Sequence, residues 1–394
     1  MRRDALVFGP PPPQSPAMTN LTTRVDAVMA AAIAEQRIVG GVVGVARRGT
    51  LVYRRAVGLA DREADRAMTE DTPFRIASLT KPVVSVAALG LVQRGAIALD
   101  QPVTRWLPEF RPRYQDDVPP ITIHQLLTHT SGLGYGFLEP VDGPYHQAQV
   151  SDGLDQPGLT LAENLRRIAS VPLRCLPGTA FHYSLSIDVL GAVLERAADA
   201  PLPDVVARGV TTPLGLSDLR FAPSDAAEAA ALAVPYCDGS PPQRIRDGVP
   251  VPYPPFETRF APSRALDRGS YASGGAGMIG TASDFLRFLE ALRTRAIPTV
   301  DAGLLDAMLR DQIAPITSDV LGDGWGFGYG ASVLRDPGAA RSPMPRGAVR
   351  WGGAYGHSWT LDPATETSTV LLTNTAFEGM SGALRDQLED AVYR

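Results

Sequence analysis

Ser78-Leu79-Thr80-Lys81, followed at once by Pro82, places a hydroxyl and an amine three positions apart in the chain. Residues i and i+3 of a helix lie on one face, so the Lys81 amine can reach back to the Ser78 hydroxyl. Proline is tolerated near a helix start, which puts Ser78 in the first turn, where the helix end favours developing negative charge. By itself this stretch also fits a helix N-cap beside a solvated lysine. It predicts a serine nucleophile only if partners for the hydroxyl lie further along the chain.

Two downstream segments offer such partners in a fixed order. The first, Phe181-His-Tyr-Ser-Leu185, precedes an apolar, helix-like run over residues 187–198. The second, Trp351-Gly-Gly-Ala-Tyr-Gly-His357, lies within strand-like sequence. Serine β-lactamases and penicillin-binding proteins likewise carry a serine–lysine motif, then a short polar triad, then a motif on a strand.

The chain resembles that superfamily and, more narrowly, the family VIII carboxylesterases, which are esterases built on the β-lactamase fold. The resemblance rests on Ser78-Leu-Thr-Lys81, Tyr183-Ser-Leu185 and Trp351-Gly-Gly353, and it covers about residues 21–393. Three further segments are shared with the family: Leu126–Leu133, Gly274–Met278 and Leu371–Thr375. The resemblance implies that the active site lies in a cleft between a sheet lobe and a mostly helical lobe.

The catalytic set implied by the resemblance is Ser78, Lys81 and Tyr183. Tyr183 is the expected general base, because a neighbouring Lys81 ammonium would favour its phenolate. Lys81 with a depressed pKa is the alternative base, and the sequence leaves the choice between the two open.

The third motif is expected to supply the oxyanion and substrate contacts. The Ser78 N–H gives one oxyanion donor, and family geometry implies the Ala354 N–H as the second. Gly352 and Gly353 allow the backbone to approach the substrate closely. His357 is expected near the site, where it would tune the chemistry.

Two departures from the β-lactamase pattern bear on the substrate. Leu185 stands where β-lactamases place an asparagine, and Trp351 stands where they place a lysine for the substrate carboxylate. Two polar anchors are thereby replaced by apolar side chains. We therefore expect a serine carboxylesterase that acts on short-chain, neutral esters through an acyl-enzyme on Ser78. The alternatives are a β-lactamase, a D-amino-acid peptidase or amidase, an acyltransferase, or a non-catalytic binding protein with this fold.

Periodicity along the chain predicts an α+β domain over residues 20–394, preceded by a flexible leader over residues 1–19. A sheet lobe is expected over about 20–75 and 320–394, and a helical lobe over about 76–319. An irregular, proline-rich segment over 235–270 is expected to wall the substrate pocket. The main predicted elements are helices at 23–34, 78–94, 187–198, 283–293, 302–309 and 382–392, and strands at 41–45, 51–57, 325–333, 349–361 and 367–374.

Composition narrows the remaining classes of function. The net charge of −5 is scattered over 394 residues, which argues against nucleic acid and anionic membrane as partners. Two cysteines cannot form a disulfide framework, and no signal peptide is visible, so a cytoplasmic location is expected. The five histidines show no ligand-like spacing, and neither a metal nor another cofactor is expected. The oligomeric state is left open.

Two familiar motifs are discounted. The G-x-G-x-x-G match at residues 275–280 follows a loop rather than a strand, which argues against a dinucleotide site. The G-x-S-x-G elbow of α/β-hydrolases does not occur in the chain.

Overall fold

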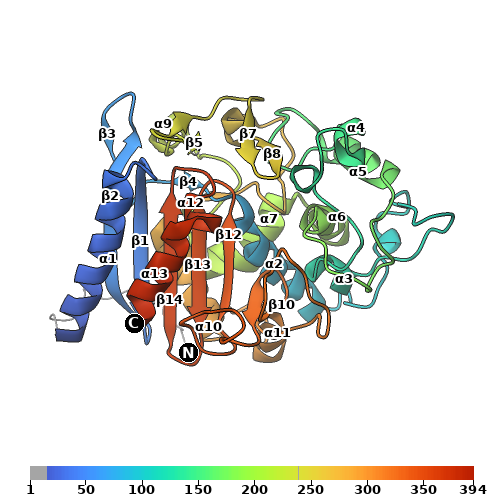
Figure 1. Cartoon of the computed structure of the whole chain (residues 1–394). Coiled ribbons are helices and arrows are strands. Elements are labelled where there is room, and N and C mark those ends of the chain that lie inside the picture. Colours follow the sequence, from blue (N-terminus) through green and yellow to red (C-terminus); the bar gives the residue numbers. More distant parts are fainter. Residues whose placement is uncertain (1–15, 238) are drawn as a thin grey trace.

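The computed structural model describes residues 16–237 and 239–394, and its main sheet joins the two ends of the chain (Figure 1). The sheet is antiparallel, with the strand order β10-β11-β12-β13-β14-β1-β2-β3. β1 pairs with β14 from Gly41 opposite Thr373 to Arg47 opposite Thr367. The strands are β1 Gly40–Arg47, β2 Thr50–Asp61, β3 Arg66–Ala67, β10 Trp325–Phe327, β11 Ser332–Leu334, β12 Val349–Gly353, β13 His357–Asp362 and β14 Thr367–Thr373.

The strands predicted at 41–45 and 51–57 are present as β1 and β2, which pair as a hairpin. Its turn residues, Arg48 and Gly49, both have positive φ, at 51° and 76°. Two-residue turns of this hand match the twist of the flanking strands, which is why they are favoured in hairpins.

The prediction of one long strand in each of two C-terminal stretches was wrong, because each stretch folds back into two strands. The stretch 325–333 forms β10 and β11, and 349–361 forms β12 and β13. Gly330 and Gly356 lie in the two turns with φ of 91° and 103°, a conformation that other residues rarely adopt. The glycines therefore mark strand ends that the alternating hydrophobic pattern alone does not show.

Helices α1 (Pro16–Ala34) and α13 (Ala383–Tyr393) lie side by side on one face of the sheet (Figure 1). The Arg24 Nε donates to the Ala391 carbonyl at 2.8 Å and links the two helices. α1 begins at Pro16, within the stretch over 1–19 that was predicted as a leader. Proline suits a first helical position, since the N–H it lacks would have no partner there. The rest of the predicted leader lies outside the described residues.

On the other face, α10 (Ala282–Arg293) packs against β1, β13 and β14. α10 thus covers the sheet, although its residues lie within the stretch predicted as the helical lobe. α2 (Thr80–Gln93) follows the nucleophile turn and packs against α6 (Ser186–Ala198), α7 (Leu202–Val206) and α11 (Ala302–Met308).

The remaining elements are short. Within the described residues, no helix is both long enough and apolar enough to cross a membrane. The predicted irregular segment 235–270 contains two small hairpins, β5 with β6 and β7 with β8. The short elements are α3 Ile123–Leu127, α4 Pro144–Gln147, α5 Leu161–Ser170, α8 Thr212–Leu214, α9 Ala226–Ala231, α12 Glu378–Ser381, β4 Phe74–Arg75, β5 Tyr236–Cys237, β6 Gln243–Arg244, β7 Pro250–Tyr253, β8 Phe256–Arg259, β9 Ile279–Gly280, the π-helix η4 Ala207–Thr211, and the 3₁₀-helices η1 Ala77–Leu79, η2 Val103–Arg105, η3 Gly136–Leu138 and η5 Pro262–Leu266.

Candidate active site

Ser78 lies in η1, one turn of 3₁₀-helix directly before α2. The preceding residue, Ala77, is buried and has a φ of 46°, which is unfavourable for a residue with a Cβ. Strained backbone of this kind persists where the surrounding packing holds it, and it is common at functional sites. The turn directs Ser78 into a cavity of 160 Å³.

Two side chains contact the Ser78 hydroxyl. The Tyr183 hydroxyl donates to Ser78 Oγ at 2.7 Å, and Lys81 Nζ donates to the same oxygen at 3.1 Å. Tyr183 arrives from the loop before α6, 105 positions along the chain, and its ring packs 5.0 Å from that of Trp351. The structure thus brings the three residues of the expected catalytic set together around one oxygen atom.

Lys81 is the only lysine in the sequence, and its side chain is fully buried. Its Nζ also donates to the Tyr135 hydroxyl at 3.0 Å and to the Gly275 carbonyl at 2.9 Å. Burial lowers the Lys81 pKa to about 7, and the carboxylates of Asp188 and Asp152 partly oppose that effect. At neutral pH about half of an amine with this pKa is unprotonated and can accept a proton, which an arginine could not do.

The pKa of Tyr183 moves in the opposite direction. Burial raises the Tyr183 pKa above its ordinary value, and hydrogen bonds with Ser78 and Trp351 offset only part of the rise. The expectation that Tyr183 is held as a phenolate is contradicted, because the desolvation of a buried anion outweighs the stabilisation available here. These two directions favour the alternative, in which Lys81 is the base and Tyr183 keeps its proton.

Strand β12 packs directly on the nucleophile turn. A Cβ at Gly353 would lie 2.7 Å from the Ile76 carbonyl oxygen and 3.0 Å from Leu79 Cδ1. A glycine is therefore required for this approach, which places Ala354 and Ser78 in the wall of the same cavity. At Gly352 a Cβ would meet Met380 Cγ at 2.5 Å, so this glycine makes room for α12. Both glycines serve the packing of the strand, in addition to any contact with substrate.

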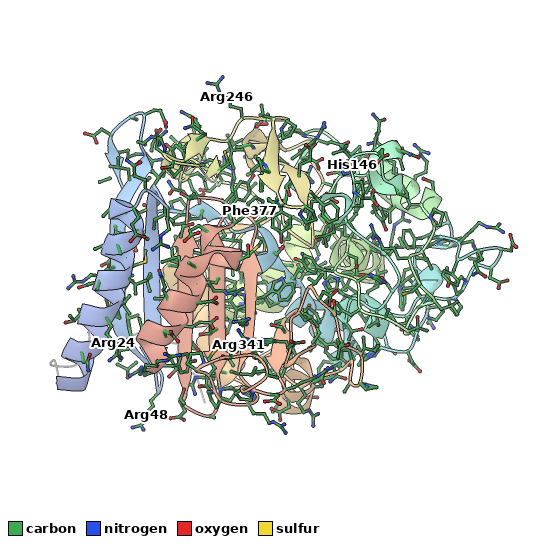
Figure 2. All side chains as sticks on the ribbon, in the orientation of Figure 1. Arg24, Arg48, His146, Arg246, Arg341 and Phe377 are labelled. Atoms are coloured by element: carbon green, nitrogen blue, oxygen red, sulfur yellow. The ribbon has the colours of Figure 1, made fainter. Side chains whose placement is uncertain are left out.

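The cavity is apolar around Ser78 and charged at its far end. Trp351 lines it, as predicted, and its Nε1 donates to the Tyr183 hydroxyl at 3.3 Å. Phe377, labelled in Figure 2, lines the cavity, and its ring lies 4.6 Å from that of Tyr253. Tyr253 belongs to the β7–β8 hairpin, which therefore helps to wall the pocket. The other apolar lining residues are Phe137, Leu138, Val320, Leu321, Trp359 and Met380. At the far end, Arg350 is paired with Glu389 at 3.0 Å.

Two predicted substrate contacts lie elsewhere. Leu185 is fully buried before α6 and does not belong to the cavity wall, because the N-cap geometry turns its side chain into the core. His357 is also buried, with Nε2 on the Arg75 carbonyl at 2.8 Å and Nδ1 accepting from the Thr373 N–H at 3.3 Å. Burial lowers its pKa to about 4, so the neutral ring holds backbone segments together. It positions the chain three residues before Ser78.

Tyr135 and Asp188 were missed by the sequence reasoning. Tyr135 follows the shared segment Leu126–Leu133 by two positions, and Asp188 is a lone carboxylate near the start of an apolar helix. Asp188 Oδ1 accepts from Ser273 Oγ at 2.6 Å, while Oδ2 has no hydrogen-bond partner among the described residues. A single buried carboxylate in an apolar helix was the signal available. Within the described part of the chain, no group of three His, Cys, Asp or Glu residues is arranged to hold a metal ion.

Comparison with known proteins defines the class. The family model described as Beta-lactamase matches residues 25–394, and the chain belongs to this family. "Esterase EstB" of Burkholderia gladioli is 54% identical over 381 residues, which cover 95% of this chain and 95% of that protein. The solved structure of "EstCE1, a hydrolase with promiscuous acyltransferase activity" has a TM-score of 0.92 and 45% identity, and the match covers 96% of this chain and 100% of that one.

A more distant structure shows the fold alone. Unliganded simvastatin synthase (LovD) from Aspergillus terreus has a TM-score of 0.74 at 21% identity, with 97% of this chain and 98% of that chain covered. The predicted β-lactamase-like α+β fold is confirmed, and the matches fit the predicted resemblance to the family VIII carboxylesterases.

Proposed function

We propose that the protein is a serine carboxylesterase that hydrolyses short-chain, neutral carboxylic esters through an acyl-enzyme on Ser78. The observation that carries the proposal is the pair of contacts on Ser78 Oγ, from Tyr183 at 2.7 Å and from Lys81 at 3.1 Å. A serine hydroxyl becomes a competent nucleophile when such a base can take its proton. The esterases among its relatives support the same class of reaction.

In acylation, the neutral amine of Lys81 accepts the Ser78 proton while Oγ attacks the ester carbonyl. The N–H groups of Ser78 and Ala354 hold the oxyanion of the tetrahedral intermediate. The Tyr183 hydroxyl donates its proton to the departing alkoxide and recovers a proton from Lys81. The alcohol leaves, and the acyl group remains on Ser78.

In deacylation, water enters and gives a proton to the same Lys81–Tyr183 pair as it attacks the acyl carbonyl. Collapse of the intermediate returns the proton to Ser78 and releases the acid. An alcohol in place of water would make the enzyme an acyltransferase with the same groups. This second candidate is supported by the similarity to EstCE1, a hydrolase with promiscuous acyltransferase activity.

The preference for neutral esters follows from the cavity wall. Next to Ser78 the wall is formed by Trp351 and aromatic side chains, which stabilise an apolar acyl or alcohol group by burial. The guanidinium of Arg350 at the far end is paired with Glu389, so its charge is compensated. Arg385, the second guanidinium in the wall, is likewise paired, with Asp386 at 2.8 Å. Both arginines of this wall are thus compensated, which disfavours an anionic β-lactam.

Steady-state kinetics on p-nitrophenyl butyrate, nitrocefin and a D-alanyl amide test the proposal. We expect rapid turnover of the ester, much weaker turnover of the β-lactam and none of the amide. Equal or higher kcat/KM for nitrocefin would establish the lactamase alternative instead. A fluorophosphonate should add one group to Ser78, and an adduct on Ser131, Ser184 or Ser358 would contradict the nucleophile assignment.

A further inference from the structure

A second cavity, of 280 Å³, lies behind the active site and shares no lining residue with the first. Three arginines line it, Arg75, Arg264 and Arg268. The carboxylate in its wall is Asp267, which accepts hydrogen bonds from the Gly269 N–H and from Ser270 Oγ, each at 2.9 Å. The lining of the cavity therefore carries more positive than negative charge.

The two inner arginines are held by neutral groups. Arg75 donates to the carbonyls of Pro262 and Ala233, at 2.9 and 3.2 Å. Arg264 likewise donates to backbone carbonyls, including Gly153 at 3.0 Å and Tyr271 at 2.8 Å. Carbonyls fix the two guanidinium groups without neutralising them.

Four carboxylates act on these two arginines through space. Asp247 acts on Arg75, and it already accepts hydrogen bonds from Ser263. Arg264 is acted on by three carboxylates, those of Asp155, Asp188 and Asp267. Of the four carboxylates Asp267 is the one that lines the cavity, so the wall carries three guanidinium groups against one carboxylate.

An unpartnered phenol completes the polar side of this cavity. Tyr355 lines it and is only 5% exposed, and its hydroxyl makes no hydrogen bond to any residue in the described ranges 16–237 and 239–394. A tyrosine hydroxyl at the wall of a cavity can donate to a ligand oxygen inside it.

The opposite wall is apolar, formed by Leu154, Pro203, Phe221, Ala276 and Met278. An inorganic ion would gain nothing from these side chains, whereas a short hydrocarbon chain would be buried against them. We propose that this cavity binds a short-chain organic carboxylate, with its oxygens on the Arg75 side chain and the Tyr355 hydroxyl. Arg268 at the mouth attracts the anion.

The cavity is lined by residues close in the chain to three parts of the active site. Arg75 precedes Ser78 by three residues, Tyr355 follows Ala354, and Ala276 follows Gly275, whose carbonyl binds Lys81. A bound anion would cancel positive charge close to the place where the oxyanion forms, and so would disfavour the negatively charged intermediate. We therefore expect the carboxylate to lower kcat. This regulatory part rests on the proposed function, whose acid product belongs to the same chemical class.

Direct binding is measured by calorimetric titration of sodium butyrate, at constant ionic strength, into protein whose Ser78 carries a phosphonate that fills the first cavity. We expect one saturable site for butyrate and no heat of binding for butanol. Tyr355→Phe and Arg268→Gln should each weaken binding about tenfold, the weight of one interaction with a charged group. Tyr329→Phe and Arg48→Gln are matched controls, because Tyr329 bonds His124 instead and Arg48 projects from the distant β1–β2 turn (Figure 2). Absence of binding, or equal affinity in the variants and the wild type, would overturn the proposal.

Steady-state kinetics test whether carboxylate bound in the second cavity lowers kcat at the active site. Butyrate should lower kcat of the wild type with little change in KM, and Arg268→Gln should require about ten times more butyrate for the same effect. A purely competitive pattern would place the acid in the first cavity and refute the coupling. If no adduct forms on Ser78 and no ester is hydrolysed, the proposed function fails, while titration of the unlabelled protein still decides whether the second cavity binds carboxylate.

Discussion

Lys81 lies at the start of α2, and its side chain is completely buried. Because burial lowers its pKa to about 7, the fraction of neutral amine rises as the pH rises through that value. The kcat/KM for ester hydrolysis should therefore rise with pH around 7 and then level off. The chain contains one lysine, so selective ¹⁵N-lysine labelling gives one side-chain Nζ signal that reports this pKa directly. Titration of that signal near pH 10 would contradict the assignment of Lys81 as base.

Lys81 and Tyr183 act on the same oxygen, so their removal should not be additive. We expect Lys81→Ala or Tyr183→Phe alone to lower kcat at least ~100-fold, the usual scale for loss of a general acid or base. The double variant should lose little more, because the two groups work as a unit. Near-normal kcat in Tyr183→Phe would show that Lys81 alone moves the proton.

Substitution of Asp188 tests how nearby carboxylates affect the pKa of Lys81. Its carboxylate raises the Lys81 pKa against the effect of burial, so Asp188→Asn should lower that pKa. The rising limb of the pH profile and the lysine signal should both move to lower pH. Asp284→Asn is the control, because this buried aspartate lies in the first turn of α10, accepts from the Asp218 N–H and is not among the groups that act on Lys81. A limb that stays in place, or moves to higher pH, would contradict the role of Asp188.

At the scale of elements, the site depends on the contact between β12 and η1. Gly353→Ala would force a Cβ against the Ile76 carbonyl and push the strand away from Ser78. We expect at least ~10-fold lower kcat/KM, since displacement of about an ångström is costly in a preorganised site. In α2, a Cβ at Gly90 would find its nearest neighbour at 3.7 Å, so Gly90→Ala should keep full activity and gain helix stability. Unchanged kinetics in Gly353→Ala would show that the approach of β12 is not required.

At the scale of the whole molecule, the N-terminal and C-terminal parts of the chain meet in the main sheet, where β1 pairs with β14. Leu21 of α1 is 1% exposed and belongs to the cluster that α1, α13 and the sheet share. Leu21→Ala should lower the free energy of unfolding by about 2–5 kcal/mol, as for other buried leucines, without changing kcat of the folded enzyme. Denaturant unfolding followed by circular dichroism measures the change. Leu176→Ala, at a residue 45% exposed, should cost far less, and an equal loss in both variants would contradict the role of this cluster.

The sequence by itself determined the class of fold and the order of the three motifs, through the resemblance that these motifs carry. The pairing of Ser78 with Lys81 is local information, because three-residue spacing on a helix places both on one face. The meeting of Tyr183 with Ser78 is not local, and it was expected only because the resemblance implies it. The local hydrophobic pattern misjudged where β10 and β12 end, because backbone reversal at Gly330 and Gly356 depends on φ angles.

The tertiary structure alone decided which groups surround those residues and how they titrate. Tyr135 and Asp188 reach Lys81 from distant segments, and burial then lowers the Lys81 pKa while it raises that of Tyr183. Packing also turned Leu185 and His357 away from the substrate cavity. Desolvation and side-chain direction depend on contacts across the whole chain, which is why the motifs predict the candidate catalytic residues but only the fold shows how burial shifts their pKa values.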